Sequence, residues 1–267
     1  MTLDKIAGCV SLGRGLIDKT ALAIFGLLAP WRDPSRWRWW SLVESVVPRI
    51  WLKPDKLNGL RVLIEPANWS QTIIFEEVFL RSGYDLNKVK FTPEVVLDCG
   101  AHIGMFSLLA KSRFPTARTI LYEPNPKNIQ MIRRQIAGNK LDIQLVESAV
   151  STETKTLLFA ASNSHSGTLL HHGSRPGAYQ VQAINFVEAF RQIKTNSLLL
   201  KMDIEGEERN VLPALLPLLP RQSALFFETH FGEPGWLEIQ QLLTQNGFCV
   251  EQINSRDEFC DGFACRE

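Results

Sequence analysis

The stretch VVLDCGAHIGMFSLLA, residues 95–110, decides the fold class of this chain. An apolar run ends at Asp98, a turn with two glycines follows, and residues with helical spacing come next. A buried strand, a tight turn and a helix in this order are typical of an open α/β sheet. Because ligands in such sheets bind beyond the carboxyl ends of the strands, we expect the turn Cys99–Gly104 to lie at a ligand site.

The glycine spacing of this turn does not fit a phosphate-binding loop. His102 stands where a dinucleotide fingerprint has its middle glycine, and no Gly-Lys-Ser/Thr of a P-loop follows. Gly100 lets the backbone approach a ligand without a Cβ in the way, and Gly104 lets the helix start close to the strand. The sequence therefore predicts a ligand without a phosphate, bound by Asp98, Gly100, Ala101, His102 and Gly104.

Strands and helices alternate regularly from this stretch onward. The predicted strands are Val95–Leu97, Thr119–Tyr122, Ile143–Val146, Leu198–Met202 and Leu225–Phe227, and the predicted helices are Met105–Ser112, Pro126–Ala137 and Trp236–Gln245. Such alternation predicts a parallel sheet with right-handed crossovers. The helix after Asn125 has an N-cap there, proline at its first position, and Gly138 to end it in the left-handed conformation.

The remaining segments are less regular. Leu60–Ile64 is predicted as a short strand and Thr72–Arg81 as a helix. Lys155–Ala161 reads as an extra strand, and a long polar loop follows it. Phe248–Ile253 is the last predicted strand, and the stretch that runs on to Cys265 could pair beside it.

The composition is that of an ordinary globular protein and excludes several classes. The chain has 267 residues, 45% hydrophobic and 21% charged, with a formal net charge of +1, so nucleic acid is a poor candidate partner. Five cysteines without a C-x-x-C motif argue against a disulfide framework and favour reduced thiols in the cytoplasm. The length suits one α/β domain, residues 57–267, preceded by a helical extension, residues 1–56.

The amino-terminal extension contains an unusual apolar and aromatic segment. Thr20–Pro30 is apolar on every side of a helix but too short to span a bilayer. Trp31–Trp40 then holds four tryptophans and three arginines. The favoured interpretation is a helix docked on the main domain. The alternative is peripheral membrane contact through residues 20–40, with the protein on the cytoplasmic face.

Glu123 closes the second predicted strand and indicates an adenosine-containing cofactor. A carboxylate at this position can accept hydrogen bonds from both hydroxyls of a ribose. Pro124 and Asn125 follow it directly. S-adenosylmethionine satisfies both halves of the predicted site, because it offers a ribose to Glu123 and an amino-acid end to the turn. Glu147, at the end of the third strand, is then placed to meet the adenine, or else is a surface acid.

Further acids gather at the same edge of the predicted sheet. The stretch LLLKMDIEGEERNVL, residues 198–212, delivers Lys201, Asp203 and Glu205, and LFFETH, residues 225–230, adds Glu228 and His230. Acids in the first turn of a helix are also explained by the helix dipole.

In order and spacing, four motifs resemble the FkbM-type S-adenosylmethionine-dependent methyltransferases: DCGAHIG, YEPNP, LKMDIEGEE and FFETH, within residues 60–248. The resemblance implies a Rossmann-like class I methyltransferase sheet, mostly parallel, with seven strands, an antiparallel last strand and helices on both faces. It also implies methylation of a hydroxyl on a sugar, glycolipid or natural product. Family members usually have Asn at the position of His102 and a small residue at that of Glu207.

Transfer of a methyl group to an alcohol needs alignment and a base. The candidate catalytic residues are Asp203, His230 and Glu205, and His230 has the pKa best suited to a base near pH 7. Alternatively, the carboxylates of Asp203 and Glu205 could hold a divalent metal such as Mg²⁺. Two carboxylates alone do not establish a metal site, so this alternative stays open. His165, His171 and His172 lie in the long polar loop and are either solvated or part of a cover over the substrate.

Two other functions remain open. A nicotinamide-dependent oxidoreductase would use the same sheet, but the pyrophosphate turn that it needs is missing. A catalytically inactive protein that binds S-adenosylmethionine would keep Glu123 and the glycines unchanged. The acceptor and the oligomeric state cannot be read from the sequence.

Overall fold

The computed structural model describes residues 49–66, 68–80, 83–161, 167–170, 178–255 and 259–266. The apolar segment Thr20–Pro30 and the Trp-rich segment Trp31–Trp40 lie outside the described residues, as do His165, His171 and His172. Among the helices that the structure describes, none is long and apolar enough to cross a membrane.

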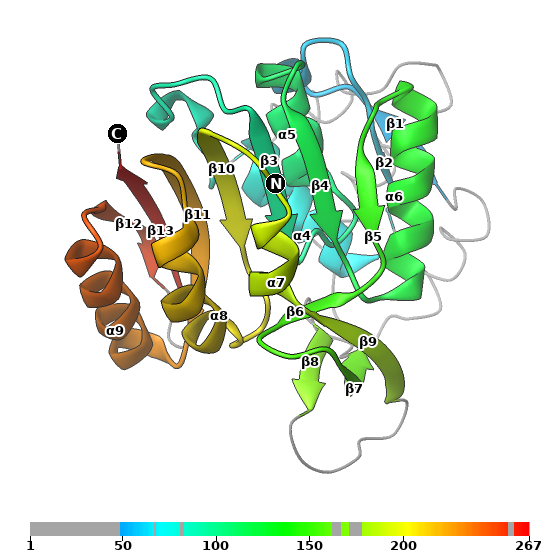
Figure 1. The fold of residues 1–267 in the computed structure, drawn as a ribbon. Coiled ribbons are helices and arrows are strands. Elements are labelled where there is room, and N and C mark those ends of the chain that lie inside the picture. The colour runs from blue at the N-terminus through cyan, green and yellow to red at the C-terminus, as the bar shows by residue number, and fades with distance from the viewer. Residues whose placement is uncertain are drawn as a thin grey trace.

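A seven-stranded sheet forms the centre of the fold (Figure 1). Its strands are β3 (Val95–Cys99), β4 (Arg118–Tyr122), β5 (Gln144–Val146), β10 (Ser197–Met202), β11 (Gln222–His230), β12 (Cys249–Ser255) and β13 (Phe259–Arg266). The spatial order is β12-β13-β11-β10-β3-β4-β5. Strands β5, β4, β3, β10 and β11 pair in parallel, whereas β13 runs antiparallel to β11. The predicted mostly parallel sheet with an antiparallel last strand is thus confirmed.

Helices cover both faces of this sheet (Figure 1). They are α4 (Trp69–Phe75), α5 (Met105–Arg113), α6 (Pro126–Asn139), α7 (Phe186–Arg191), α8 (Glu208–Leu215) and α9 (Gly232–Gln245). Side chains of α4 and α5 pack on one face, and those of α7, α8 and α9 pack on the other. Both faces of the central strands are therefore buried, which is why their sequence is apolar at consecutive positions.

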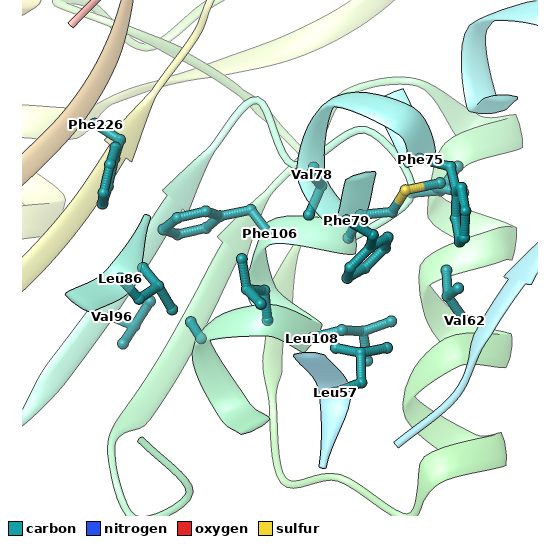
Figure 2. Close-up of a cluster of buried hydrophobic side chains, with 14 of the residues drawn as sticks. Leu57, Val62, Phe75, Val78, Phe79, Leu86, Val96, Phe106, Leu108 and Phe226 are labelled. Atoms are coloured by element: carbon teal, nitrogen blue, oxygen red, sulfur yellow. The ribbon is translucent and has the colours of Figure 1, made fainter. Parts of the chain in front are cut away.

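The core on the first face is rich in aromatic side chains (Figure 2). Tyr84 lies edge-on to Phe106 and Phe226, with ring centroids 5.1 and 5.5 Å apart. Phe75 and Phe79, from α4 and the π-helical turn Glu76–Leu80, extend the same cluster. These side chains join the segment before β3 to the centre of the sheet.

A short hairpin extends this core. Strands β1 (Ile50–Leu52) and β2 (Val62–Ile64) pair antiparallel, and Ile50 and Leu52 are buried. The part of the predicted extension that is described, residues 49–56, thus packs onto the sheet, while the domain boundary itself stays a prediction.

The cap predicted for α6 is only half right. Asn125 caps the helix by accepting from the Lys127 amide, as expected. The helix nevertheless continues past Gly138, and Lys140 takes the left-handed conformation with φ 54°. Gly138 has a packing role instead, because a Cβ there would lie 2.3 Å from the Trp51 ring.

A second sheet of four strands was not predicted, although its strand β7 has the bounds of the extra strand expected at Lys155–Ala161. Strands β6 (Ala149–Ser151), β7 (Lys155–Ala161), β8 (Gly167–Leu170) and β9 (Tyr179–Asn185) form it, in the order β6-β9-β7-β8. It lies beyond the carboxyl end of β5, on the edge of the main sheet where the predicted ligand site is (Figure 1). Strand β8 falls within the stretch that we expected to be a polar loop.

Candidate cofactor and acid site

The glycine turn after β3 is shaped by its neighbour on β10. Gly100 has φ +76°, and a Cβ on it would lie 1.8 Å from the backbone oxygen of Asp203. The close approach to the β10 turn therefore requires glycine here, while the expected contact with a ligand stays a prediction. The Gly100 and Ala101 amides donate to the Tyr122 carbonyl at 3.0 and 3.1 Å, which fastens the turn to β4.

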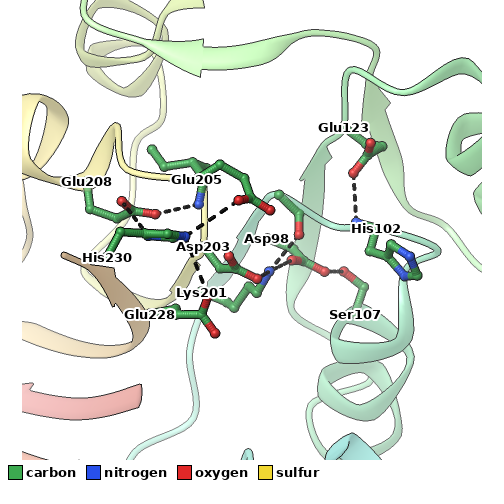
Figure 3. A network of polar contacts seen from close by, with 12 residues as sticks. Asp98, His102, Ser107, Glu123, Lys201, Asp203, Glu205, Glu208, Glu228 and His230 are labelled. Carbon is green, nitrogen blue, oxygen red and sulfur yellow. Dashed lines mark hydrogen bonds and ion pairs between the residues drawn. The ribbon is translucent and has the colours of Figure 1, made fainter. Parts of the chain in front are cut away.

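The same turn meets Glu123 directly (Figure 3). His102 has φ +51°, and its backbone amide donates to Glu123 Oε2 at 2.7 Å. The His102 ring points the other way, with Nε2 3.0 Å from Ser70 Oγ of α4. Gly104 follows with φ +83° and begins α5. The predicted turn and the predicted ribose-binding acid thus lie side by side.

Glu123 is buried, and the protein holds it by three hydrogen bonds. Its Oε1 accepts from the Asn125 amide at 2.9 Å and from Asn128 Nδ2 at 3.2 Å, in addition to the His102 contact. Burial raises its pKa to about 7, and the hydrogen bonds from Asn125, Asn128 and His102 oppose that rise. Sequence reasoning missed Asn128, although one helical turn after the Asn125 cap its side chain can face the preceding strand end.

Lys201 joins strand β3 to the turns that follow β3 and β10, at the carboxyl edge of the sheet. Its Nζ donates to the Gly100 carbonyl at 2.6 Å and to Asp203 Oδ2 at 3.1 Å, and lies 3.9 Å from Asp98 Oδ1. Burial would lower the pKa of Lys201, but Asp203 and Asp98 outweigh it and raise that pKa. Asp98 also accepts from Ser107 Oγ at 2.6 Å and is fully buried. Asp98 therefore organises the β3 turn from within the core.

Glu208 has a role that the sequence did not reveal. Its Oε1 accepts from the Ile204 amide at 2.6 Å and its Oε2 from the Gly206 amide at 2.9 Å, so the side chain folds back on the turn between β10 and α8. That turn places Glu205, with φ +60°, toward the site. The helix-dipole explanation given for these acids was incomplete.

His230 lies inside a group of carboxylates at the end of β11 (Figure 3). Its Nδ1 is 3.4 Å from Glu208, and its Nε2 is 3.6 Å from both Glu205 and Glu228. Burial would lower the pKa of His230, but Glu205 and Glu208 raise it to about 11. This rise runs against the sequence-based expectation of a base with a pKa near 7.

The carboxyl groups around His230 also have raised pKa values. Burial, followed by the charges of Asp203 and Asp261, raises the pKa of Glu228 to about 10. Burial raises that of Glu205 as well. One ligand atom each from Asp203, Glu228 and His230 lies within 4.8 Å of the others, a spacing that could hold a metal ion.

The last predicted cofactor residues lie at the margin of the site. Pro124 and Asn125 are half-buried beside Glu123, and the Asn125 side chain is used as the helix cap. Glu147 follows β5, is exposed and forms an ion pair with Arg133 of α6. Its predicted contact with an adenine stays a prediction.

Comparisons with known proteins agree with the motif pattern. The family model described as the methyltransferase FkbM domain matches residues 98–250. A segment of 100 residues is 35% identical to the AMB antimetabolite synthetase AmbE of Pseudomonas aeruginosa, and it covers 37% of this chain but only 4% of that protein. The 31-O-demethyl-FK506 methyltransferase FkbM of Streptomyces tacrolimicus is 25% identical, over 72% of this chain and 87% of its own.

A solved structure of the same name is a more distant match. Methyltransferase FkbM from Methylobacillus flagellatus is 14% identical, with a TM-score of 0.45, over 98% of this chain and 58% of that one.

Proposed function

The chain belongs to the FkbM family of methyltransferases, and on this premise we propose that it transfers the methyl group of S-adenosylmethionine to a hydroxyl of a sugar, glycolipid or natural product. The observation that carries the proposal is the 2.7 Å contact between the His102 amide and Glu123. It joins a turn without phosphate-binding features to a buried acid at the next strand end, which suits a ribose and an amino-acid tail.

The hydrogen-bonding capacity of Glu123 is compatible with this cofactor. A carboxylate has about four lone-pair positions, and three are used by His102, Asn125 and Asn128. One position on Oε2 therefore remains for a ribose hydroxyl. The turn residues Gly100, Ala101 and Gly104 would face the amino-acid end, and Glu147 the adenine.

The acid cluster supplies what the acceptor needs. The cofactor, when bound, provides an electrophilic methyl group on a sulfonium. Asp203 and Glu205 would accept hydrogen bonds from the acceptor hydroxyl and orient its oxygen toward that methyl group. Glu205 is the better proton acceptor, because Asp203 is already paired with Lys201. The relative named for methylation of 31-O-demethyl-FK506 supports oxygen as the methylated atom.

Calorimetric titration of the full chain tests the proposal. S-adenosylmethionine should bind and NAD should not, and Glu123→Ala should weaken the cofactor at least tenfold. The control is Glu251→Ala, an exposed acid on β12 that pairs with Lys88, which should bind as the unchanged protein does. Binding of NAD alone would replace the proposal with an oxidoreductase. Equal affinities in the two variants would remove Glu123 from the site.

A further inference from the structure

We propose that Asp203, Glu228 and His230 bind a divalent transition-metal ion that holds the acceptor hydroxyl, a role that rests on the methyltransferase function proposed above. Among the described residues, this is the group whose ligand atoms all lie within 4.8 Å of one another. Ligand atoms of one metal ion lie about 2.0 to 2.3 Å from it, so small side-chain movements would complete the site. Glu205 and Glu208 surround this group without belonging to it.

The sheet itself brings these three residues together. Glu228 and His230 are two positions apart on β11, so they point to the same side of the sheet. Strands β10 and β11 are parallel neighbours in which Met202 pairs with Phe227. Asp203, the residue after Met202, therefore lies beside Glu228, the residue after Phe227. Two of the ligands lie on β11 and the third directly follows β10, and regular elements hold site residues more precisely than loops do.

The His230 ring provides an independent indication of a missing ligand. Its side chain is only 10% exposed, and neither ring nitrogen has a hydrogen-bond partner among the described residues. The ring is held edge-on to Phe259, with centroids 5.2 Å apart. A buried imidazole normally satisfies its nitrogens. The oxygens nearest to Nε2, on Glu205 and Glu228, are 3.6 Å away, beyond hydrogen-bond distance, and a metal ion between Glu228 and Asp203 would give this nitrogen a closer partner.

Glu208 completes the arrangement from behind. It is buried, both of its oxygens are held by the Ile204 and Gly206 amides, and its Oε2 lies 3.4 Å from His230 Nδ1. A carboxylate that faces one nitrogen of a histidine leaves the other nitrogen to bind metal, which is the usual outer arrangement of metal-bound histidines.

The ligand set indicates the class of metal and of acceptor. One imidazole with two carboxylates suits Mn²⁺, Fe²⁺, Co²⁺ or Zn²⁺ better than Mg²⁺, which prefers oxygen ligands alone. Three protein ligands leave positions open for the acceptor. We therefore expect an acceptor with two neighbouring oxygens, such as a vicinal diol or an α-hydroxy carbonyl.

The transfer step balances with this arrangement. The metal-held hydroxyl oxygen forms a bond to the methyl carbon, and the carbon–sulfur pair returns to sulfur to give a neutral thioether. The hydroxyl proton passes to the Glu205 carboxylate, whose Oε2 lies 3.6 Å from His230 Nε2. Metal coordination favours loss of that proton by lowering the pKa of the bound hydroxyl.

The test is direct binding of Mn²⁺ to the full chain after treatment with EDTA, followed by electron paramagnetic resonance and by the shift in melting temperature. We expect one Mn²⁺ per chain, displaced by Zn²⁺ more readily than by Mg²⁺. Glu228→Gln and His230→Gln should each weaken Mn²⁺ at least tenfold, while Glu251→Gln should leave it unchanged. Both site variants should keep their affinity for S-adenosylmethionine within about threefold, which also shows that they are folded.

The two proposals fail separately in this experiment. Binding of S-adenosylmethionine without any Mn²⁺-dependent signal would overturn the metal site and leave the methyltransferase proposal intact. Binding of Mn²⁺ by a protein that does not bind S-adenosylmethionine would overturn the methyltransferase proposal and leave the metal site intact. Mn²⁺ affinity that is equal in the unchanged protein and in both site variants would also overturn the assignment of these ligands.

Discussion

Alanine substitutions at Gly100 and Gly104 separate two reasons for a glycine in the turn after β3. Both residues have positive φ, +76° and +83°, so an alanine at either position pays a similar conformational cost of about 1–2 kcal/mol. The space around them differs. A Cβ on Gly104 would make ordinary contacts of 3.5 Å with Ile132 and Leu121. A Cβ on Gly100 would lie 1.8 Å from the Asp203 backbone oxygen.

The difference between the two variants should therefore measure the clash alone. The Asp203 carbonyl must move by about 1.2 Å to reach the 3.0 Å below which real Cβ contacts essentially never occur. Forced overpacking of this kind costs about 1–3 kcal/mol, and more where backbone must move. We expect Gly104→Ala to lower the free energy of unfolding by about 1–2 kcal/mol and Gly100→Ala by about 3–5 kcal/mol.

Urea unfolding followed by tryptophan fluorescence measures both values, provided that the dependence on urea is the same in each variant. The unchanged protein is the common reference. Losses that agree within about 0.5 kcal/mol would refute the reasoning, because they would mean that the β10 turn yields freely to a side chain at position 100. A loss larger for Gly104→Ala than for Gly100→Ala would refute it as well.

Three further predictions concern single polar groups. The pKa of Glu123 rises from 4.5 to about 7 on folding, so between these pH values the folded state binds more protons than the unfolded state. The contribution of Glu123 to the free energy of unfolding should therefore fall by about 3 kcal/mol as the pH rises from 4.5 to 7. Glu123→Gln should flatten this part of the pH dependence in urea unfolding, and an unchanged slope would contradict the assignment. Ser107→Ala should lower the free energy of unfolding by about 2 kcal/mol, because it removes the 2.6 Å hydrogen bond to the buried Asp98 carboxylate. A loss below about 0.5 kcal/mol in urea unfolding would argue against that hydrogen bond. Glu208→Ala should lower the free energy of unfolding by about 3 kcal/mol, because the Ile204 and Gly206 amides lose their acceptor. The matched control is Glu233→Ala, which removes an exposed acid from the first turn of α9 and should lower it by less than about 0.5 kcal/mol. Equal losses in these two variants would mean that Glu208 acts only through the helix dipole.

Local patterns were sufficient for the central sheet but not for the contacts across it. The apolar runs that end at Asp98 and Glu123 identify buried parallel strands, because a strand covered on both faces is apolar at consecutive positions. The contact between Gly100 and the Asp203 carbonyl joins segments 103 positions apart and depends on the register of β3 with β10. No local signal in the sequence specifies such a contact. The need for glycine at position 100 was therefore recognised, but the packing against the Asp203 carbonyl was not.

The second sheet and the role of Glu208 were missed for different physical reasons. Strand β6 is three residues long and follows β5 almost directly, so periodicity cannot separate the two. Glu208 belongs to a run of acids at the start of a helix, and the helix dipole already explains acids there. Only the structure shows that this side chain turns back to the amides of Ile204 and Gly206. A residue type that fits a simple explanation can thus conceal a more specific one.

The distribution of charge at the sheet edge connects the fold to the proposed metal site. Lys201 lies on the central strand β10, opposite Asp98 on β3, and its ammonium group also reaches Asp203 and the Gly100 carbonyl. This cation thereby holds strand β3 and the turns after β3 and β10 together. The acids that remain on the β11 side, Glu205 and Glu228, face His230, whose ring nitrogens make no hydrogen bond among the described residues. Such crowding of acids favours the binding of a cation, and a metal ion at the proposed site would place its charge where the acceptor must be held.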